Sequence, residues 1–220
     1  MPEQNLDTIE VSDDDLALEA TEPEGLDADA VERRSAALAQ VRKFGDPVLR
    51  SVASPVTDFD AALAAEVERM VELMRDGMGV GLAATQLGVL RRLLVFQAGP
   101  DAPATALINP EIEWSSDELV SAEEGCLSLP GVVVDVERPL HVRVRAQDAQ
   151  GGRLSIEASG LEARVIQHEV DHLDGVLMLK RTSREQRKGA LRALREGGTY
   201  APPREEEGAE AEAPDRAAAG

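Results

Sequence analysis

The sequence of 220 residues contains one cysteine, Cys126, and few aromatic side chains: three Phe, one Trp and one Tyr. A single cysteine excludes an internal disulfide and fits a reducing compartment. The shortage of aromatic residues excludes a stacking surface for single-stranded nucleic acid. It also leaves the core to be built from aliphatic side chains. No apolar run approaches the length that spans a membrane, so we expect no membrane segment.

Basic residues are also scarce, with 23 against 42 acidic ones, and the formal net charge is -19. The excess lies at the ends, since residues 1–32 carry 12 acidic and no basic side chains, and residues 199–220 carry six acidic and two basic ones. Both ends lack the apolar periodicity that a core requires. We therefore expect a single domain at 38–197 between acidic, disordered segments at 1–37 and 198–220. A chain this acidic repels a phosphate backbone, so we expect no DNA partner.

The N-terminal stretch has neither a basic start nor an apolar segment, and it is acidic. These features argue against a secretory signal and against an organellar transit peptide. We therefore expect a cytoplasmic protein.

Between the acidic ends, helical and extended patterns alternate. An apolar stripe closed by Gly77 predicts a helix over 57–76, and similar patterns predict helices over 161–173 and 183–196. Alternating or short apolar runs predict strands at 93–97, 105–114, 132–139, 140–148 and 153–159. This mixed order predicts an α+β fold rather than a regular array of parallel βαβ units.

The sharpest chemical signal is the pentapeptide His168-Glu169-Val170-Asp171-His172. Residues four apart lie on one face of a helix, so both imidazoles can bind one metal ion while Glu169 lies beside a bound water. A solvent-exposed helix with two unrelated histidines is the alternative. The sequence contains only three histidines, and two of them stand at this chelating spacing.

A catalytic metal site usually takes three protein ligands, so a third is needed. His141 is a candidate, but it lies in an alternating strand pattern where a packing or surface role is common. Cys126 is the better candidate because it lies between Gly125 and Gly131 in a segment where the backbone can approach a ligand. An unpaired cysteine can equally be a small buried hydrophobic side chain.

Three segments together resemble the signature motifs of the peptide deformylase family: Gly-Val-Gly-Leu-Ala-Ala-Thr-Gln at 79–86, Glu-Gly-Cys-Leu-Ser at 124–128 and Gln-His-Glu-Val-Asp-His at 167–172. The resemblance covers about residues 38–197 and begins at Lys-Phe-Gly-Asp-Pro-Val-Leu-Arg, residues 43–50. It implies a deformylase-like domain of antiparallel strands around a central metal-binding helix, with a C-terminal helix.

The resemblance also implies an activity, the removal of the formyl group from the N-terminal formyl-Met of nascent chains with release of formate. Metal-bound water would attack the formyl carbon, and Glu169 would be the general base and acid. Gln86 and the backbone N–H of Leu127 would stabilise the oxyanion. The metal would be one Fe2+, with Zn2+, Ni2+ or Co2+ as alternatives.

Further residues are expected to bind metal or substrate. The metal ligands implied by the motifs are Cys126, His168 and His172. The glycines of the first motif would run against an extended peptide, and apolar side chains would line a pocket for the methionine. The expected substrate-binding residues are Gly79, Val80, Gly81, Glu124, Leu161 and Val165. Val132-Val133 depart from the family pattern, in which many members carry an arginine here.

Two other functions compete with deformylation. A metallopeptidase or other amidase could use the same histidine helix with a third ligand outside the cysteine motif. A closed structural metal site would serve an interaction module, although such a site needs no glutamate between its histidines. Separately, the basic helix 183–196 could dock on the ribosome or could be a solvated helix face.

Overall fold

The computed structural model describes residues 25–204, so the expected acidic segments lie partly outside the described residues. The described chain contains four α-helices, seven strands and three short 3-10 turns. The helices are α1 (Ala28–Leu38), α2 (Ala61–Asp76), α3 (Gly160–Leu173) and α4 (Arg184–Glu196). The strands are β1 (Gly81–Ala83), β2 (Leu93–Phe96), β3 (Thr105–Ser115), β4 (Leu119–Gly125), β5 (Val133–Pro139), β6 (His141–Gln147) and β7 (Arg153–Ser159). The 3-10 turns are η2 (Pro47–Arg50), η3 (Ala84–Leu87) and η4 (Met178–Lys180).

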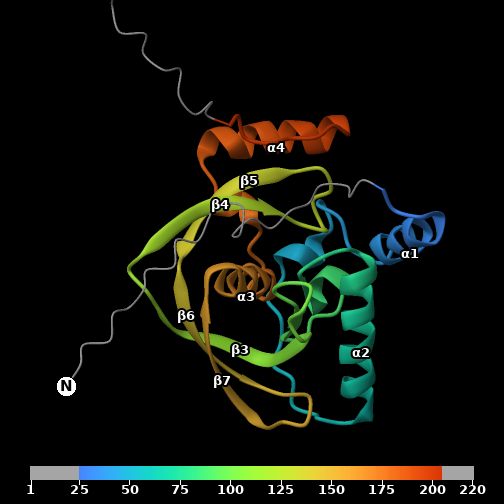
Figure 1. The fold of residues 1–220 in the computed structure, drawn as a ribbon, viewed down its shortest axis with the longest axis vertical. Coiled ribbons are helices and arrows are strands. Elements are labelled where there is room, and N and C mark those ends of the chain that lie inside the picture. Colours follow the sequence, from blue (N-terminus) through green and yellow to red (C-terminus); the bar gives the residue numbers. More distant parts are fainter. Residues whose placement is uncertain (1–24, 205–220) are drawn as a thin grey trace, which may run out of the picture.

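The strands form two antiparallel sheets around one helix. Five strands pair in the order β1-β2-β3-β6-β7, and β4 pairs with β5 alone. Helix α3 runs through the middle, with the large sheet on one side and the β4–β5 pair on the other (Figure 1). The α+β architecture with a central helix and a C-terminal helix is therefore confirmed. None of the helices within residues 25–204 combines the length and the apolar character required to cross a bilayer.

The large sheet is covered on both faces. Strand β2 is buried at all four positions, and its side chains alternate between the two faces. Leu94 and Phe96 pack in the cluster that contains Val165 and Ile166 of α3. Leu93 and Val95 pack in the cluster that contains α2 side chains such as Met70. Helices α2 and α3 therefore pack on opposite faces of the sheet, and α3 is buried from Ala163 to Leu173.

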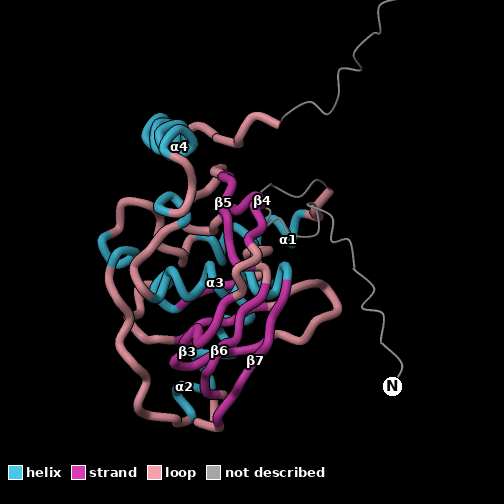
Figure 2. The backbone as a smooth tube through the Cα atoms, turned by 90° about the vertical axis from the view of Figure 1, so that its left-hand side faces the viewer, coloured by secondary structure: helices cyan, strands magenta, loops and turns pink. Residues whose placement is uncertain are grey.

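A third apolar cluster lies under the C-terminal helix. Val134 and Val136 of β5 pack there with Ala190 of α4, and Cys126 belongs to the same cluster. Figures 1 and 2 show α4 outside the β4–β5 pair, at one end of the molecule. The small sheet thus connects α4 to the segment that carries Cys126.

The structure differs from the sequence predictions in four segments. Helix α2 begins at Ala61 rather than at 57, because the Asp60 side chain caps the helix by accepting from Leu63 N–H. Residues 28–38 form α1, where we expected no regular structure, and Asp27 caps this helix. Strand β4 and the short strand β1 were also not predicted, because their sequences contain glycines and polar residues.

Helix α3 ends where the chain must turn sharply. Gly175 has φ of 68°, and a Cβ atom there would lie 2.6 Å from the backbone oxygen of Arg50. The segment that follows Arg50 also contacts the end of this helix, since Ala53 N–H donates to the carbonyl of Leu173 at 2.8 Å. Only glycine permits both the left-handed conformation and this close backbone contact.

We predict that Gly175→Ala lowers the free energy of unfolding by about 3 kcal/mol, since both strain and a backbone clash oppose the methyl group. Gly197→Ala is the matched control, because Gly197 has φ of 69° but nothing within 4 Å of a Cβ. That variant should lose only about 1 kcal/mol. Urea unfolding of both variants measures the difference, and equal losses would contradict the backbone-contact argument.

Candidate active site

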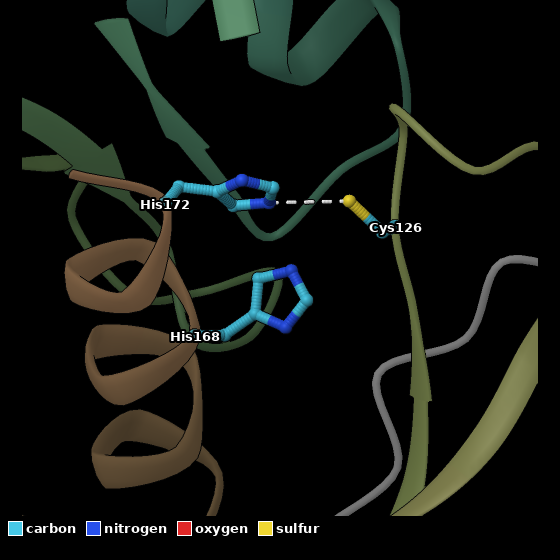
Figure 3. Close-up of side chains that lie close together, drawn as sticks. All are labelled: Cys126, His168 and His172. Carbon is cyan, nitrogen blue, oxygen red and sulfur yellow. Dashed lines mark hydrogen bonds between the residues drawn. The ribbon is translucent and has the colours of Figure 1, made fainter. Parts of the chain in front are cut away.

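Cys126, His168 and His172 form a buried cluster. Figure 3 shows the two imidazoles on successive turns of α3, facing the sulfur atom of Cys126 on the chain that leaves β4. The Sγ of Cys126 lies 3.2 Å from Nε2 of His172, and one ligand atom from each residue lies within 4.8 Å of the others. Two imidazoles and a thiolate form a donor set that suits a divalent transition metal.

The hydrogen bonding of the histidines fits this use. Nδ1 of His168 lies 2.9 Å from Oε2 of Glu124, so a proton on Nδ1 leaves the Nε2 lone pair available for a metal ion. Burial lowers the pKa of His172 well below its usual value, which favours the neutral ligand form. His141 is not part of the cluster, since it lies on β6 with its Nδ1 2.8 Å from the Ser159 hydroxyl.

Glu124 lies behind His168 and is fully buried. Its carboxylate accepts hydrogen bonds from Arg138 and from Arg164, both of which are also buried. Burial alone would raise the pKa of Glu124, but the hydrogen bonds from His168 and Arg138 outweigh it and hold that pKa well below its usual range. The carboxylate is therefore ionised, and its partners lie within the protein.

The network continues through the third helix. Nη1 of Arg138 donates to Oδ2 of Asp171 at 3.0 Å, and Asp171 also accepts from Arg181. Arg138 and Arg164 were missed by the sequence analysis. The spacing of both residues could have indicated that they face the site. Arg138 is two residues after Val136 and so shares its inward face of β5, and Arg164 is four residues before His168 and so shares its face of α3.

Glu169 lies next to the cluster with a free oxygen. Its side chain is buried, and burial raises the pKa of Glu169 to about 7. Within residues 25–204, Oε2 of Glu169 has no hydrogen-bond partner. A Cβ atom on Gly81 would lie 2.5 Å from Oε1 of Glu169, so the absence of a side chain at Gly81 leaves room for this carboxylate.

Gln86 faces the cluster from η3. Its Oε1 accepts from Ala83 N–H at 2.9 Å, which fixes the orientation of the amide. Its Nε2 lies 3.3 Å from Oγ of Ser128 and 3.6 Å from Sγ of Cys126. The donor end of the amide therefore points at the ligand cluster, and Leu127 follows Cys126 on the same loop.

The remaining residues that were expected to bind substrate are Gly79, Val80, Leu161 and Val165. A Cβ on Gly79 would lie 2.9 Å from Cδ1 of Leu127, so the first motif runs close to the cysteine loop. Val80 and Leu161 are partly buried beside the α3 cluster, whereas Val165 is fully buried within it. Val80 and Leu161 can face a ligand, but Val165 is part of the core.

Comparison with known proteins shows where the chain belongs. Residues 38–188 match the family model described as polypeptide deformylase. A peptide deformylase of Parafrankia sp. is 45% identical over 156 residues, which cover 71% of this chain and 85% of that protein. A peptide deformylase of Thermotoga neapolitana is 51% identical over 142 residues, which cover 64% of this chain and 85% of that protein.

Structural comparison agrees with the sequence comparison. The crystal structure of peptide deformylase 1B from Arabidopsis thaliana superimposes with a TM-score of 0.69 at 38% identity, covering 71% of this chain and 88% of that one. The matched region includes the histidine helix, the cysteine loop and the glycine-rich segment. The chain therefore belongs to the polypeptide deformylase family, a family of metal-dependent hydrolases.

Proposed function

We propose that this protein removes the formyl group from the N-terminal formyl-Met of nascent chains and releases formate. The observation that carries the proposal is the joint placement of three metal-ligating side chains with Glu169 and Gln86 in one buried cluster. The names of the relatives supply the substrate class. A cytoplasmic location follows for this proposal, since nascent chains carry their formyl group where they are made.

Cys126, His168 and His172 would hold the metal ion, which we propose to be Fe2+, with Zn2+, Ni2+ and Co2+ as alternatives. When bound, such an ion makes water acidic enough to act as a nucleophile near neutral pH, and it polarises a carbonyl oxygen. Glu124 holds the ring of His168 by the Nδ1 contact. Because its carboxylate is fully buried and occupied by three cationic or donor groups, we propose that it positions His168 rather than binds substrate.

Glu169 would move the proton in both halves of the reaction. Its free Oε2 can accept a proton from the attacking water and later donate it to the departing amine nitrogen. A pKa of about 7, raised by burial, lets one carboxyl group act as base and as acid near neutral pH.

Gln86 Nε2 and the Leu127 N–H would meet the negative charge that develops on the formyl oxygen. The Ala83 contact holds the Gln86 amide in one orientation before substrate binds. A preoriented donor of this kind contributes about a hundredfold to a thousandfold in rate. The backbone of residues 79–81 would lie along the substrate peptide, and Val80 and Leu161 would line the methionine pocket.

The geometry favours deformylation over its two rivals. A closed structural site has no use for a buried carboxylate with an unpaired oxygen beside the ligands, since such an oxygen costs stability. The metallopeptidase alternative needs a third ligand outside the cysteine motif, whereas Cys126 of that motif lies with the two histidines. Glu169 and Gln86 together suit a carbonyl group that is attacked by water.

Helix α4 supports a proposal about partners. Its five basic side chains, Arg184, Arg187, Lys188, Arg192 and Arg195, are all exposed, while Ala190 and Ala193 face the protein. An exposed basic face can bind the phosphate backbone of ribosomal RNA. We propose that the protein associates with the ribosome through this helix.

We predict that Glu169→Gln keeps its metal content and loses activity by about a hundredfold or more, because the amide cannot accept the proton. Formate release from a formyl-Met peptide measures the activity, and cleavage of an internal peptide bond is assayed in parallel. Retained formate release in this variant would contradict the role of Glu169. Internal cleavage by the wild type would favour the metallopeptidase alternative.

We predict that Cys126→Ser lowers metal affinity by at least about tenfold, because a neutral hydroxyl replaces a thiolate ligand. His141→Ala is the matched control, since His141 lies outside the cluster and should leave metal content unchanged. Anaerobic purification followed by metal analysis compares the two variants and also identifies the native ion. Full, tight metal loading in Cys126→Ser would exclude Cys126 as a ligand.

We predict that replacing Arg184, Arg187, Lys188 and Arg192 together by Gln weakens co-sedimentation with ribosomes and flattens its dependence on salt. The exposed Arg143, Arg145 and Arg153 on β6 and β7, replaced in the same way, form the control. Peptide deformylation should be unchanged in both variants. Equal ribosome binding by the α4 variant and the wild type would count against the docking role.

A further inference from the structure

Residues 42–44 connect two parts of the candidate site that are far apart in sequence. The backbone N–H of Arg42 donates to the carbonyl of Gln86 at 2.7 Å, and the backbone N–H of Phe44 donates to the carbonyl of Ser128 at 2.8 Å. Gln86 lies on η3, whereas Ser128 lies on the cysteine loop. This connecting segment, residues 42–44, therefore ties together the two loops that carry the proposed oxyanion donors.

Lys43, the middle residue of the connecting segment, adds a side-chain contact to the cysteine loop. Its Nζ donates to the carbonyl oxygen of Leu127 at 2.9 Å, and the side chain is half-buried. A hydrogen bond from an ammonium group is stronger than one between neutral groups. The contact therefore holds a specific peptide unit, the one that joins Leu127 to Ser128.

The local turn makes no hydrogen bond of its own to this peptide unit. Leu129 N–H donates to the carbonyl of Cys126 at 2.9 Å, which closes a turn with Leu127 and Ser128 at its centre. The central peptide of such a turn makes no hydrogen bond within it, and its rotation interconverts two turn types. The two turn types differ in the sign of φ at Ser128, and Ser128 does not have a positive φ. The loop therefore has the turn type with a negative φ at this residue, and not the rotated one.

The Leu127–Ser128 peptide lies between the groups that bear on the two proposed donors. On its amino side is Leu127, whose N–H is one of those donors. On its carboxyl side is Ser128, whose Oγ accepts from Nε2 of Gln86. A rotated peptide would require a positive φ at Ser128 and would move this hydroxyl away from the Gln86 amide.

We propose that Lys43 is a positioning residue for the oxyanion donors, which it aligns by holding the Leu127 carbonyl. The proposal rests on the proposed deformylase activity. Lys43 touches neither the formyl group nor the ligands' donor atoms in this role, and it acts through the Leu127–Ser128 peptide. Its loss should therefore weaken stabilisation of the developing oxyanion more than it weakens substrate binding.

Lys43→Met removes the donor and keeps the length and apolar stem of the side chain. We expect kcat for formate release to fall by about ten- to a hundredfold, with KM changed by less than about twofold and with metal content unchanged. Lys43→Arg, which restores a charged donor, should recover most of the activity. Lys180→Met, the same replacement at an exposed lysine of η4, is the matched control and should behave as the wild type.

Thermal unfolding of each variant separates positioning from folding. Should Lys43→Met fail to fold, Lys43→Leu, which also lacks a donor, replaces it in the same measurements. A fully active Lys43→Met variant, or a loss confined to KM or explained by lost metal, would overturn the proposal while leaving the deformylase activity intact. A metal-loaded wild type that releases no formate would overturn the proposed function, and the role of Lys43 with it.

Discussion

The buried carboxylate of Glu124 is the constraint on which the rest of the site depends. An ionised carboxyl group is expensive to remove from water unless charged donors surround it. Arg138 of β5, Arg164 of α3 and the His168 ring supply these donors. Since Glu124 is two residues before Cys126 on the same chain segment, satisfying this one charge also fixes the small sheet against α3. The distance between the cysteine sulfur and the histidine rings follows from that docking.

The same network extends beyond the cysteine–histidine cluster to Arg181, just before the C-terminal helix. Arg138 is shared between Glu124 and Asp171, and Asp171 is shared between Arg138 and Arg181. Charges of opposite sign thus alternate from Glu124, which contacts the His168 ring, to the half-exposed side chain of Arg181. Each buried member has partners on two sides, so removal of any one would leave an uncompensated buried charge. This arrangement couples the positions of Cys126 and the two histidines to β5 and to the segment before α4.

The sequence predicted the elements with strong periodicity and the residues within short motifs. Helix α3 and the five predicted strands have the expected type and nearly the expected bounds, and Cys126 joins the histidines as anticipated. Strand β4 was not predicted because its serine and glutamate residues interrupt any apolar alternation, and pairing with β5 determines its structure.

Tertiary contacts and burial could not be predicted in the same way. The contact between Lys43 and Leu127 spans 84 residues, and no local pattern indicates such a pairing. The sequence also could not show that Val165 lies fully buried between α3 and the large sheet, and its expected role in a substrate pocket stays a prediction.

Oε2 of Glu169 is a buried polar atom whose use is in the reaction rather than in the packing of the fold. The helix that carries it is buried along most of its length, and a polar atom in such a place normally finds a partner. Oε2 of Glu169 has none among the protein atoms of residues 25–204, so it is left for water or substrate. The charged groups around Glu124 hold the helix in position, and the absence of a side chain at Gly81 leaves room for the carboxylate. A reacting water would supply the missing hydrogen bond, so the interaction that the folded chain lacks is one that the bound substrate complex can provide.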